Sequence, residues 1–203
     1  MARRKEIGRN KILNIAYKMV VKDGVESLTA RNIAKVGHFS TQPLYLEFNN
    51  MHELRKEVLR KIADNLKNNI LQKKYTDKPL IDIDLSYIEF AQEHENLFRA
   101  MFVDGKLGSE IISDTLITLG IEKFKEQYQD TDYSDEKIKS IVTANWITAI
   151  GIASLIVNRI ATFSQTQIVN VLTAQINDAI LNDWLSKTGK VSIFDNVTGK
   201  SKN

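Results

Sequence analysis

The chain has 203 residues, 43% of them hydrophobic, which is enough apolar material for a folded core and argues against a disordered protein. Only two prolines and nine glycines occur, so few residues interrupt helices and an all-α fold is predicted. The absence of cysteine excludes a disulfide framework, a thiolate metal site and a cysteine nucleophile.

Charge is unevenly distributed along the chain. The formal net charge is +3, but residues 1–60 contain twelve Lys or Arg and six Asp or Glu, a net of +6, which leaves −3 for residues 61–203. This asymmetry indicates that the N-terminal third faces a polyanion. An ordinary solvated basic face is the alternative at this point.

No segment of the sequence predicts a membrane association. The first residues carry no apolar signal core, and the longest apolar run, Ile147–Ile156, is interrupted by Thr148, Gly151 and Ser154. A bilayer span needs roughly 20 apolar residues. We therefore expect a cytoplasmic protein.

The first 73 residues predict a long helix, two short ones and a second long one. Apolar residues at helical spacing indicate a helix over residues 6–22, which Asp23-Gly24 ends. Short helices over 30–36 and 41–48 follow, then a long helix over 51–73, which Asn50 can cap. Isolated helices below about 12–15 residues are marginal in water, so the short pair must pack on the longer helices. A compact three-helix unit with a helix-turn-helix is predicted.

The remaining chain predicts a larger helical unit. A polar connector with Pro79 follows residue 73, and the tail from residue 186 is short and polar. Between them, helical patterns cover residues 80–94, 95–103, 109–128, 135–163 and 165–185.

Three segments of the N-terminal part together resemble the DNA-binding domain of the TetR family of transcription regulators. They are Leu28–Ala34, Ser40–Phe48 and Glu53-Leu54, and the resemblance covers about residues 8–60. It implies a helix-turn-helix DNA-binding domain over residues 1–50 and a connecting helix over 51–73. A ligand-binding and dimerisation domain over 74–186 and a flexible tail over 187–203 complete the expected organisation.

The second short helix of such a domain enters the major groove, where base edges and phosphates are contacted. Gln42 suits adenine, Arg31 suits guanine, and Pro43 offers apolar contact to a thymine methyl group. By resemblance, Tyr45 donates its hydroxyl to a phosphate. The alternatives are that Thr29 only caps a helix and that Arg31 is a solvated surface charge. The complete set of expected DNA contacts is Thr29, Arg31, Ser40, Thr41, Gln42, Pro43 and Tyr45.

Two positions depart from the family pattern. His38 stands where the family has Gly in the turn, so either His38 adopts a positive φ or the turn shifts to use Gly37. Met51 stands where the family often has Lys at the start of the long helix. Backbone N–H groups there can still bind phosphate. The missing attraction is expected from Arg3, Arg4, Lys5 and Lys11.

The C-terminal part resembles the family less closely. Asn145–Leu155 is similar to a Trp-x-x-x-His-Gly segment of one group of regulatory domains, with Ile150 in place of His. We expect a pocket for a small apolar or amphipathic effector, although aromatic residues and Met at helical spacing more often form core. The expected pocket residues are Tyr87, Phe90, Phe98, Met101, Phe102, Asn145, Trp146 and Ile150.

The last two long helices predict a homodimer interface. Small residues between Ala144 and Ser154 allow close helix approach, and the last helix carries an apolar stripe. The stripe consists of Ile168, Val171, Leu172, Ile176, Ala179 and Ile180. Dimerisation suits a helix-turn-helix, because two copies on a two-fold axis read a palindrome.

The resemblance implies a repressor that binds palindromic double-stranded operator DNA as a homodimer and is released by a small molecule. The alternative is a helix-turn-helix protein that a protein partner controls, or that acts without a small-molecule ligand. Catalysis is not expected, because the sequence has no Gly-rich phosphate loop, metal-ligand spacing or nucleophile elbow. Asp82 and Asp84 are interpreted as helix-start charges, and no cofactor or metal is predicted.

Overall fold

All regular structure in the described residues is helical, which confirms the predicted all-α fold. The structure is a computed structural model that describes residues 7–103, 109–129, 131–182 and 185. Arg3, Arg4, Lys5 and the predicted tail over 187–203 lie outside the described residues. The helices are α1 Arg9–Asp23, α2 Ala30–Gly37, α3 Gln42–Glu47, α4 Met51–Asn68, α5 Pro79–Glu93, α6 Glu95–Phe98, α7 Ser109–Gln127, α8 Asp135–Val157 and α9 Gln165–Asn182.

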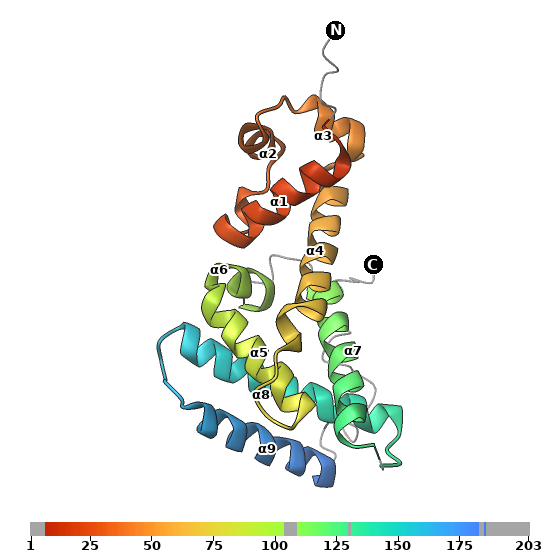
Figure 1. Ribbon diagram of the computed structural model, residues 1–203, viewed down its shortest axis with the longest axis vertical. Helices are drawn as coiled ribbons and strands as arrows, with labels where there is room; N and C mark the ends of the chain where they lie inside the picture. Colours follow the sequence, from red (N-terminus) through yellow and green to blue (C-terminus); the bar gives the residue numbers. More distant parts are fainter. Residues whose placement is uncertain (1–6, 104–108, 130, 183–184, 186–203) are drawn as a thin grey trace, which may run out of the picture. The chain divides into compact units, whose positions relative to one another are not determined.

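The chain divides into two compact units (Figure 1). Unit 1 comprises Met1–Asp64 and Asn96–Ser109, and unit 2 comprises Asn65–Glu95 and Glu110–Asn203. The division falls within α4, between Asp64 and Asn65. The functional boundaries at residues 50 and 73 stay predictions.

Unit 1 is built on the apolar face of α1. Ile12, Ala16, Met19 and Val20 recur at helical spacing and are all buried. The helix ends at Gly24, whose φ of 78° favours glycine and whose N–H donates to the Val20 carbonyl at 3.0 Å. Helices α2 and α3 both pack against α1.

Unit 2 is built around α5, which is buried on all sides from Leu80 to Ile88. This helix packs against α8 and α9, which also pack against each other (Figure 1). A helix that is apolar all round requires such surroundings. Asp82 and Asp84, interpreted from the sequence as helix-start charges, are both buried in this helix.

The connection between α8 and α9 is short and well defined. Helix α8 ends at Val157, before the predicted residue 163, because Arg159 adopts a φ of 57° and the Ile160 N–H turns back to the Leu155 carbonyl at 2.9 Å. Helix α9 then starts with reciprocal bonds between Ser164 and Gln167. The Gln167 N–H donates to Ser164 Oγ at 3.2 Å, and the Ser164 N–H donates to Gln167 Oε1 at 2.8 Å.

Helix α8 is longer than the apolar run Ile147–Ile156, on which the expectation of no membrane-spanning segment was based. Over its whole length it is the one helix in the described ranges that is long and apolar enough to cross a membrane. In this fold it packs against α5 and α9 and buries residues such as Ile141, Asn145 and Ala149. The core helix of a globular protein has the same length and composition.

Candidate nucleic-acid interface

Helices α2 and α3 form the helix-turn-helix of unit 1. Thr29 caps α2, since its hydroxyl accepts a hydrogen bond from the Asn32 N–H at 3.2 Å. Ile33 and Ala34 are buried on α2, and Leu44 and Phe48 are buried on and just after α3. Pro43 lies in the first turn of α3, where its missing N–H costs no hydrogen bond. One face of each short helix is therefore fixed by the core.

Of the two alternatives for the turn between these helices, the structure shows the one in which His38 adopts a positive φ. His38 adopts the left-handed conformation, with φ of 55° and ψ of 46°, and closes the end of α2. The Phe39 N–H donates to the Ala34 carbonyl at 3.0 Å. A Cβ atom on Gly37 would overlap the Phe39 ring, so a larger residue there would force that ring to move.

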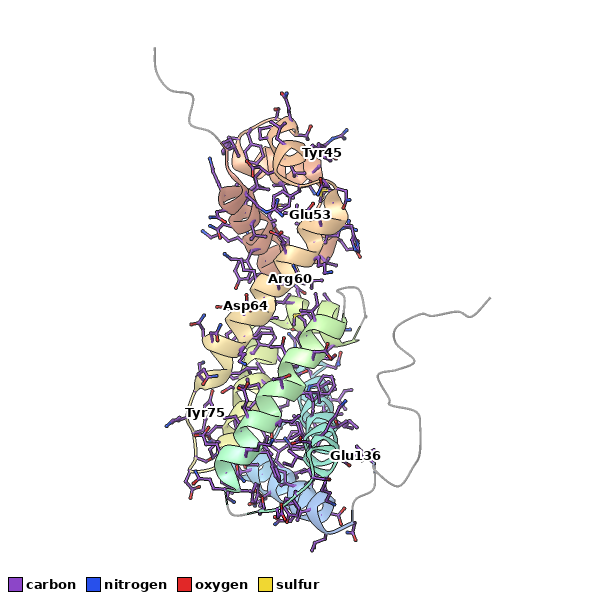
Figure 2. All side chains as sticks on the ribbon, turned by 90° about the vertical axis from the view of Figure 1, so that its right-hand side faces the viewer. Tyr45, Glu53, Arg60, Asp64, Tyr75 and Glu136 are labelled. Atoms are coloured by element: carbon purple, nitrogen blue, oxygen red, sulfur yellow. The ribbon has the colours of Figure 1, made fainter. Side chains whose placement is uncertain are left out.

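The predicted DNA contacts lie on the solvent side of this motif. Thr29, Arg31, Ser40, Thr41, Gln42 and Tyr45 are exposed, and Pro43 is half-buried. Tyr45, labelled in Figure 2, is 54% exposed although it is a large aromatic side chain. These positions are accessible to a partner molecule.

Sequence reasoning missed one strongly exposed apolar residue on α3. Leu46 is 77% exposed, and Val36 on α2 is also exposed. Leu46 lies two residues from both Leu44 and Phe48, so helical spacing alone places it opposite the core. That spacing was the available signal.

The start of α4 is already occupied by side chains. As predicted, Asn50 caps it, because its Oδ1 accepts from the Glu53 N–H at 2.9 Å. The Glu53 carboxylate accepts from the Asn49 backbone N–H at 2.8 Å and from Asn49 Nδ2 at 2.7 Å. Met51 is half-buried. A phosphate at this terminus would meet the negative charge of Glu53, which opposes the predicted contact.

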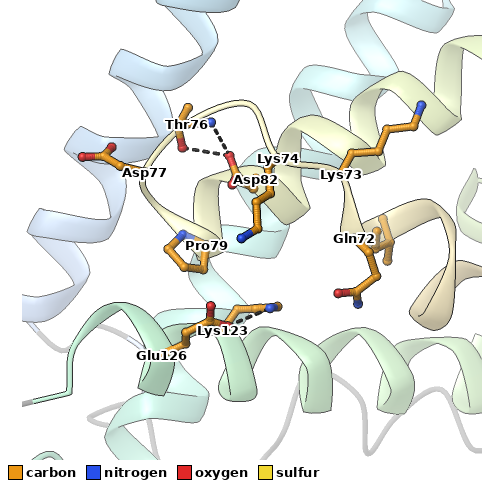
Figure 3. Close-up of a pocket in the computed structure, with 10 residues that line it drawn as sticks. Gln72, Lys73, Lys74, Thr76, Asp77, Pro79, Asp82, Lys123 and Glu126 are labelled. Carbon is orange, nitrogen blue, oxygen red and sulfur yellow. Dashed lines mark hydrogen bonds and ion pairs between the residues drawn. The ribbon is translucent and has the colours of Figure 1, made fainter.

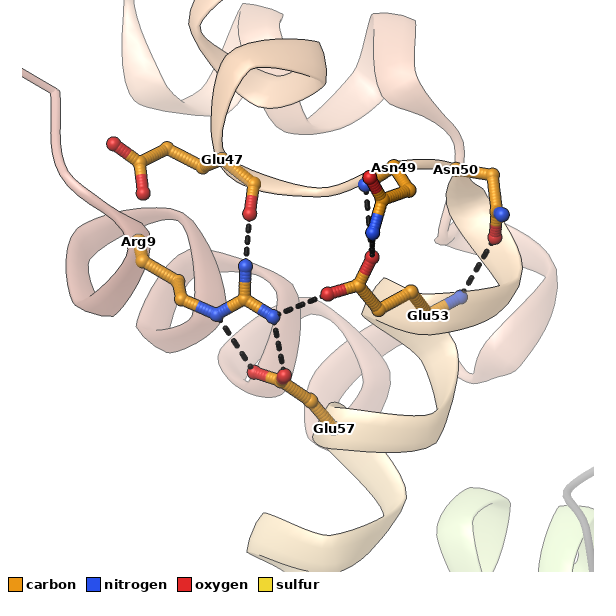
Figure 4. Close-up of polar contacts among 6 residues, drawn as sticks. All are labelled: Arg9, Glu47, Asn49, Asn50, Glu53 and Glu57. Carbon is orange, nitrogen blue, oxygen red and sulfur yellow. Dashed lines mark hydrogen bonds and ion pairs between the residues drawn. The ribbon is translucent and has the colours of Figure 1, made fainter.

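Arg9 connects three elements of unit 1, and sequence reasoning did not identify it (Figure 4). Its guanidinium bonds the Glu57 carboxylate, with Nε at 3.3 Å from Oε2, and bonds Glu53, with Nη2 at 2.5 Å from Oε1. It also donates to the Glu47 carbonyl at the end of α3 and lies 4.1 Å from the centre of the Phe48 ring. These partners are 38–48 residues away in sequence, so no local pattern indicated them.

The charges in this Arg9 cluster shift each other's ionisation. Hydrogen bonds to Glu57 and Glu53 raise the pKa of Arg9, and the bond from Arg9 is the largest cause that lowers the pKa of Glu53. The cluster thus holds the end of α3 between α1 and α4.

Replacing Arg9 with Met should make the protein less stable at pH 7, because the guanidinium bonds are lost. A carboxylate with a lowered pKa stabilises the folded state above its unfolded pKa of about 4.3 and loses that effect as pH falls through the folded pKa. The difference between the variant and the wild type should therefore shrink in acid. Thermal denaturation from neutral to acidic pH measures this, and a pH-independent difference would assign the effect to Phe48 packing alone.

The predicted effector residues are divided between the two units. Tyr87 and Phe90 on α5 and Asn145, Trp146 and Ile150 on α8 belong to unit 2. Phe98 on α6 and Met101 and Phe102 in the π-helical turn Arg99–Val103 belong to unit 1. Trp146, Ile150 and Phe102 are half-buried and the other five are buried. Most of these side chains thus contribute to cores.

Unit 2 contains a cavity that is lined by residues other than the predicted effector residues (Figure 3). It measures about 240 Å³ and is bordered by charged side chains, including Lys73, Lys74, Lys123 and Glu126. Asp82 reaches it but accepts hydrogen bonds from the Thr76 N–H and hydroxyl, both at 2.8 Å. None of the eight predicted effector residues borders this cavity. In the described ranges, no cluster of His, Asp and Glu is arranged to hold a metal ion.

A helix-turn-helix unit followed by a larger helical unit defines the fold of TetR-like regulators. One solved structure with this fold is a TetR-like transcriptional regulator from Rhodococcus sp. RHA1, which matches with a TM-score of 0.53 and 14% sequence identity. The match covers 89% of this chain and 99% of that chain. No family model and no curated protein matches the sequence. The resemblance inferred from residues 8–60 is thus confirmed for the fold.

Proposed function

We propose that this chain is a cytoplasmic DNA-binding transcription regulator that binds a palindromic operator as a homodimer and acts as a repressor. The observation that carries the proposal is the exposed set on α2 and α3. Six of the seven residues predicted to contact DNA are exposed, while Ile33, Leu44 and Phe48 anchor the same segment in the core. This combination suits a segment that is held rigidly and reads a groove.

The proposed homodimer uses the outward faces of α8 and α9. Ile147, Gly151 and Leu155 are exposed at i, i+4 and i+8 on α8, and no atom lies within 4 Å of a Cβ built on Gly151. On α9, Val171, Ala174 and Leu181 are exposed at helical spacing. Of the predicted stripe on α9, Ile168, Leu172, Ile176 and Ala179 are buried within the chain. Of that stripe Val171 is exposed, so the face proposed for the partner is the one that carries Val171, Ala174 and Leu181.

The proposed effector is a small apolar or amphipathic molecule that releases the protein from DNA. Tyr87, Asn145, Trp146 and Ile150 lie on helices α5 and α8 of unit 2 and supply both apolar and polar groups. Control by a protein partner is the second candidate, favoured by the charged side chains that border the described cavity. Release of DNA by a small-molecule panel, measured by fluorescence anisotropy, would distinguish the two.

Arg31 gives the sharpest test of DNA recognition. A duplex that the full-length protein selects from a random pool should be palindromic. The Arg31→Ala substitution should weaken binding to this duplex by about 1–3 kcal/mol and relax the preference at one base pair. Raising salt should weaken binding with a log-log slope of about −0.9 for each phosphate neutralised. Fluorescence anisotropy titrations measure both.

The matched control is Arg60→Ala, which removes another exposed arginine, from α4 (Figure 2). It should leave the base preference unchanged. Failure to select any duplex, or an affinity that does not respond to salt, would refute DNA binding. Equal effects of the two substitutions would refute a base contact by Arg31.

A further inference from the structure

The buried polar pair Asp84–Asn145 in unit 2 has no role in the proposed DNA contact. Asp84 on α5 is 4% exposed and Asn145 on α8 is 2% exposed. Asn145 Nδ2 donates to Asp84 Oδ2 at 2.7 Å, so this pair joins the two helices inside the core. Buried polar side chains of this kind normally have all their hydrogen-bonding groups satisfied.

If Asp84 is ionised, one hydrogen-bond acceptor of this pair is left without a donor. Among the described residues, Asn145 Oδ1 is buried and has no donor. An ionised carboxylate only accepts hydrogen bonds, so it cannot supply that donor, whereas a neutral carboxylic acid has one O–H to give. A carboxyl and a carboxamide side by side can satisfy each other through two bonds only when the carboxyl bears a proton.

The surroundings of Asp84 provide no compensating positive charge. No described lysine, arginine or histidine forms a hydrogen bond or ion pair with it. Tyr87 lies one turn further along α5, and burial first and a charge on Asp84 second raise the pKa of its hydroxyl. On the same helix, Asp82 is bonded to Thr76, and Glu89 is bonded to Lys73. Burying an unpaired carboxylate is strongly unfavourable.

Among the described side chains, no charged residue of α7, α8 or α9 forms a hydrogen bond or ion pair with Asp84. On α8 the charged residues stand in its first two turns, and the described buried residues of α7 and α9 are uncharged. The charged residues concerned are Asp114, Glu122, Lys123, Lys125 and Glu126 on α7, Asp135, Glu136, Lys137 and Lys139 on α8, and Asp178 on α9.

We propose that Asp84 is a neutral carboxylic acid at neutral pH and donates its proton to Asn145 Oδ1, which makes the contact between α5 and α8 proton-linked. Burial raises the pKa of Asp84 well above its ordinary value and outweighs the Asn145 hydrogen bond, which lowers it. Loss of the proton at high pH leaves an uncompensated charge between the two helices. This inference does not depend on DNA binding.

The pH dependence of stability tests the proposal. Unfolded Asp releases its proton near pH 3.9, so above about pH 5 the folded state holds one proton more than the unfolded state, and stability falls as pH rises. Relative to Asp84→Asn, which mimics the neutral acid, the unfolding equilibrium constant of the wild type should rise about tenfold per pH unit until folded Asp84 ionises. Urea denaturation of the full chain, followed by tryptophan fluorescence, measures this ratio.

Asp114→Asn is the matched control, because it removes an exposed carboxylate from α7 and should retain the pH dependence of the wild type. Infrared spectroscopy of wild-type protein with carbon-13-labelled aspartate needs no variant. It should show the carbonyl band of a protonated carboxyl at pH 7, and this band should disappear in alkali. Identical pH profiles for the wild type and Asp84→Asn, or absence of the band at pH 7, would overturn the proposal.

Discussion

Replacing Phe48 with Ala is expected to destabilise unit 1 by about 3–5 kcal/mol, the usual cost of removing a buried aromatic side chain. Phe48 follows α3 directly and is almost fully buried, and its ring also supports the Arg9 guanidinium. Its loss removes the apolar anchor at one end of α3 and a contact of the Arg9 cluster together. Hydrogen exchange of backbone amides in α1–α3 should accelerate accordingly.

Leu46→Ala is the matched control, because it truncates an exposed apolar residue of the same helix. Surface substitutions of this kind usually change stability by less than about 0.5 kcal/mol. Equal acceleration of exchange in both variants would contradict the assignment of Phe48 as the anchor of α3. Binding to the selected duplex should fall for Phe48→Ala in parallel with the loss of protection.

Replacing Val171 with Lys is expected to convert the proposed homodimer into a monomer. Val171 is 48% exposed on α9, Ile147 is 50% exposed on α8, and the proposed interface would bury both. A lysine placed there adds two like charges across the two-fold axis and must be desolvated. Affinity for the palindromic duplex should fall about 10²- to 10⁴-fold, because linked binding of two half-sites is lost.

Thr118→Lys is the matched control, since it adds the same charge at an exposed β-branched position of α7, outside the proposed interface. Sedimentation velocity reports the oligomeric state, and titration of a single half-site should give equal affinities for both variants. A Val171→Lys protein that remains a dimer would place the interface elsewhere. A wild type that is monomeric at all concentrations would remove the dimer from the proposal.

Local patterns predicted the helices well, because their signals lie close together in sequence. Gly24 ends α1, Thr29 starts α2 and Asn50 caps α4, each through hydrogen bonds to residues three or four positions away. The end of α8 was wrong because it depends on Arg159, a residue other than glycine with a positive φ. No sequence rule marks such a residue in advance.

The polar interior could not be predicted for the opposite reason. Asp84 and Asn145 are 61 residues apart, and their meeting depends on how α5 and α8 pack. Asp82 and Asp84 are the same residue type on the same helix. However, Asp82 accepts hydrogen bonds from the preceding loop, whereas Asp84 accepts one from Asn145 on a second helix. The exposed contacts on α2 and α3 were identified through a family resemblance, and their roles stay predictions.

The short connection from Val157 to Gln165 has a consequence for assembly. Because Arg159 and the Ser164–Gln167 bonds define both ends of that connection, α8 and α9 form a helical hairpin with a fixed register. Hydrogen bonds within the hairpin therefore fix the position of the exposed α8 residues from Ile147 onward relative to the exposed α9 residues from Val171 onward. Each subunit would then present a preorganised interface, and dimerisation would require little ordering of the backbone.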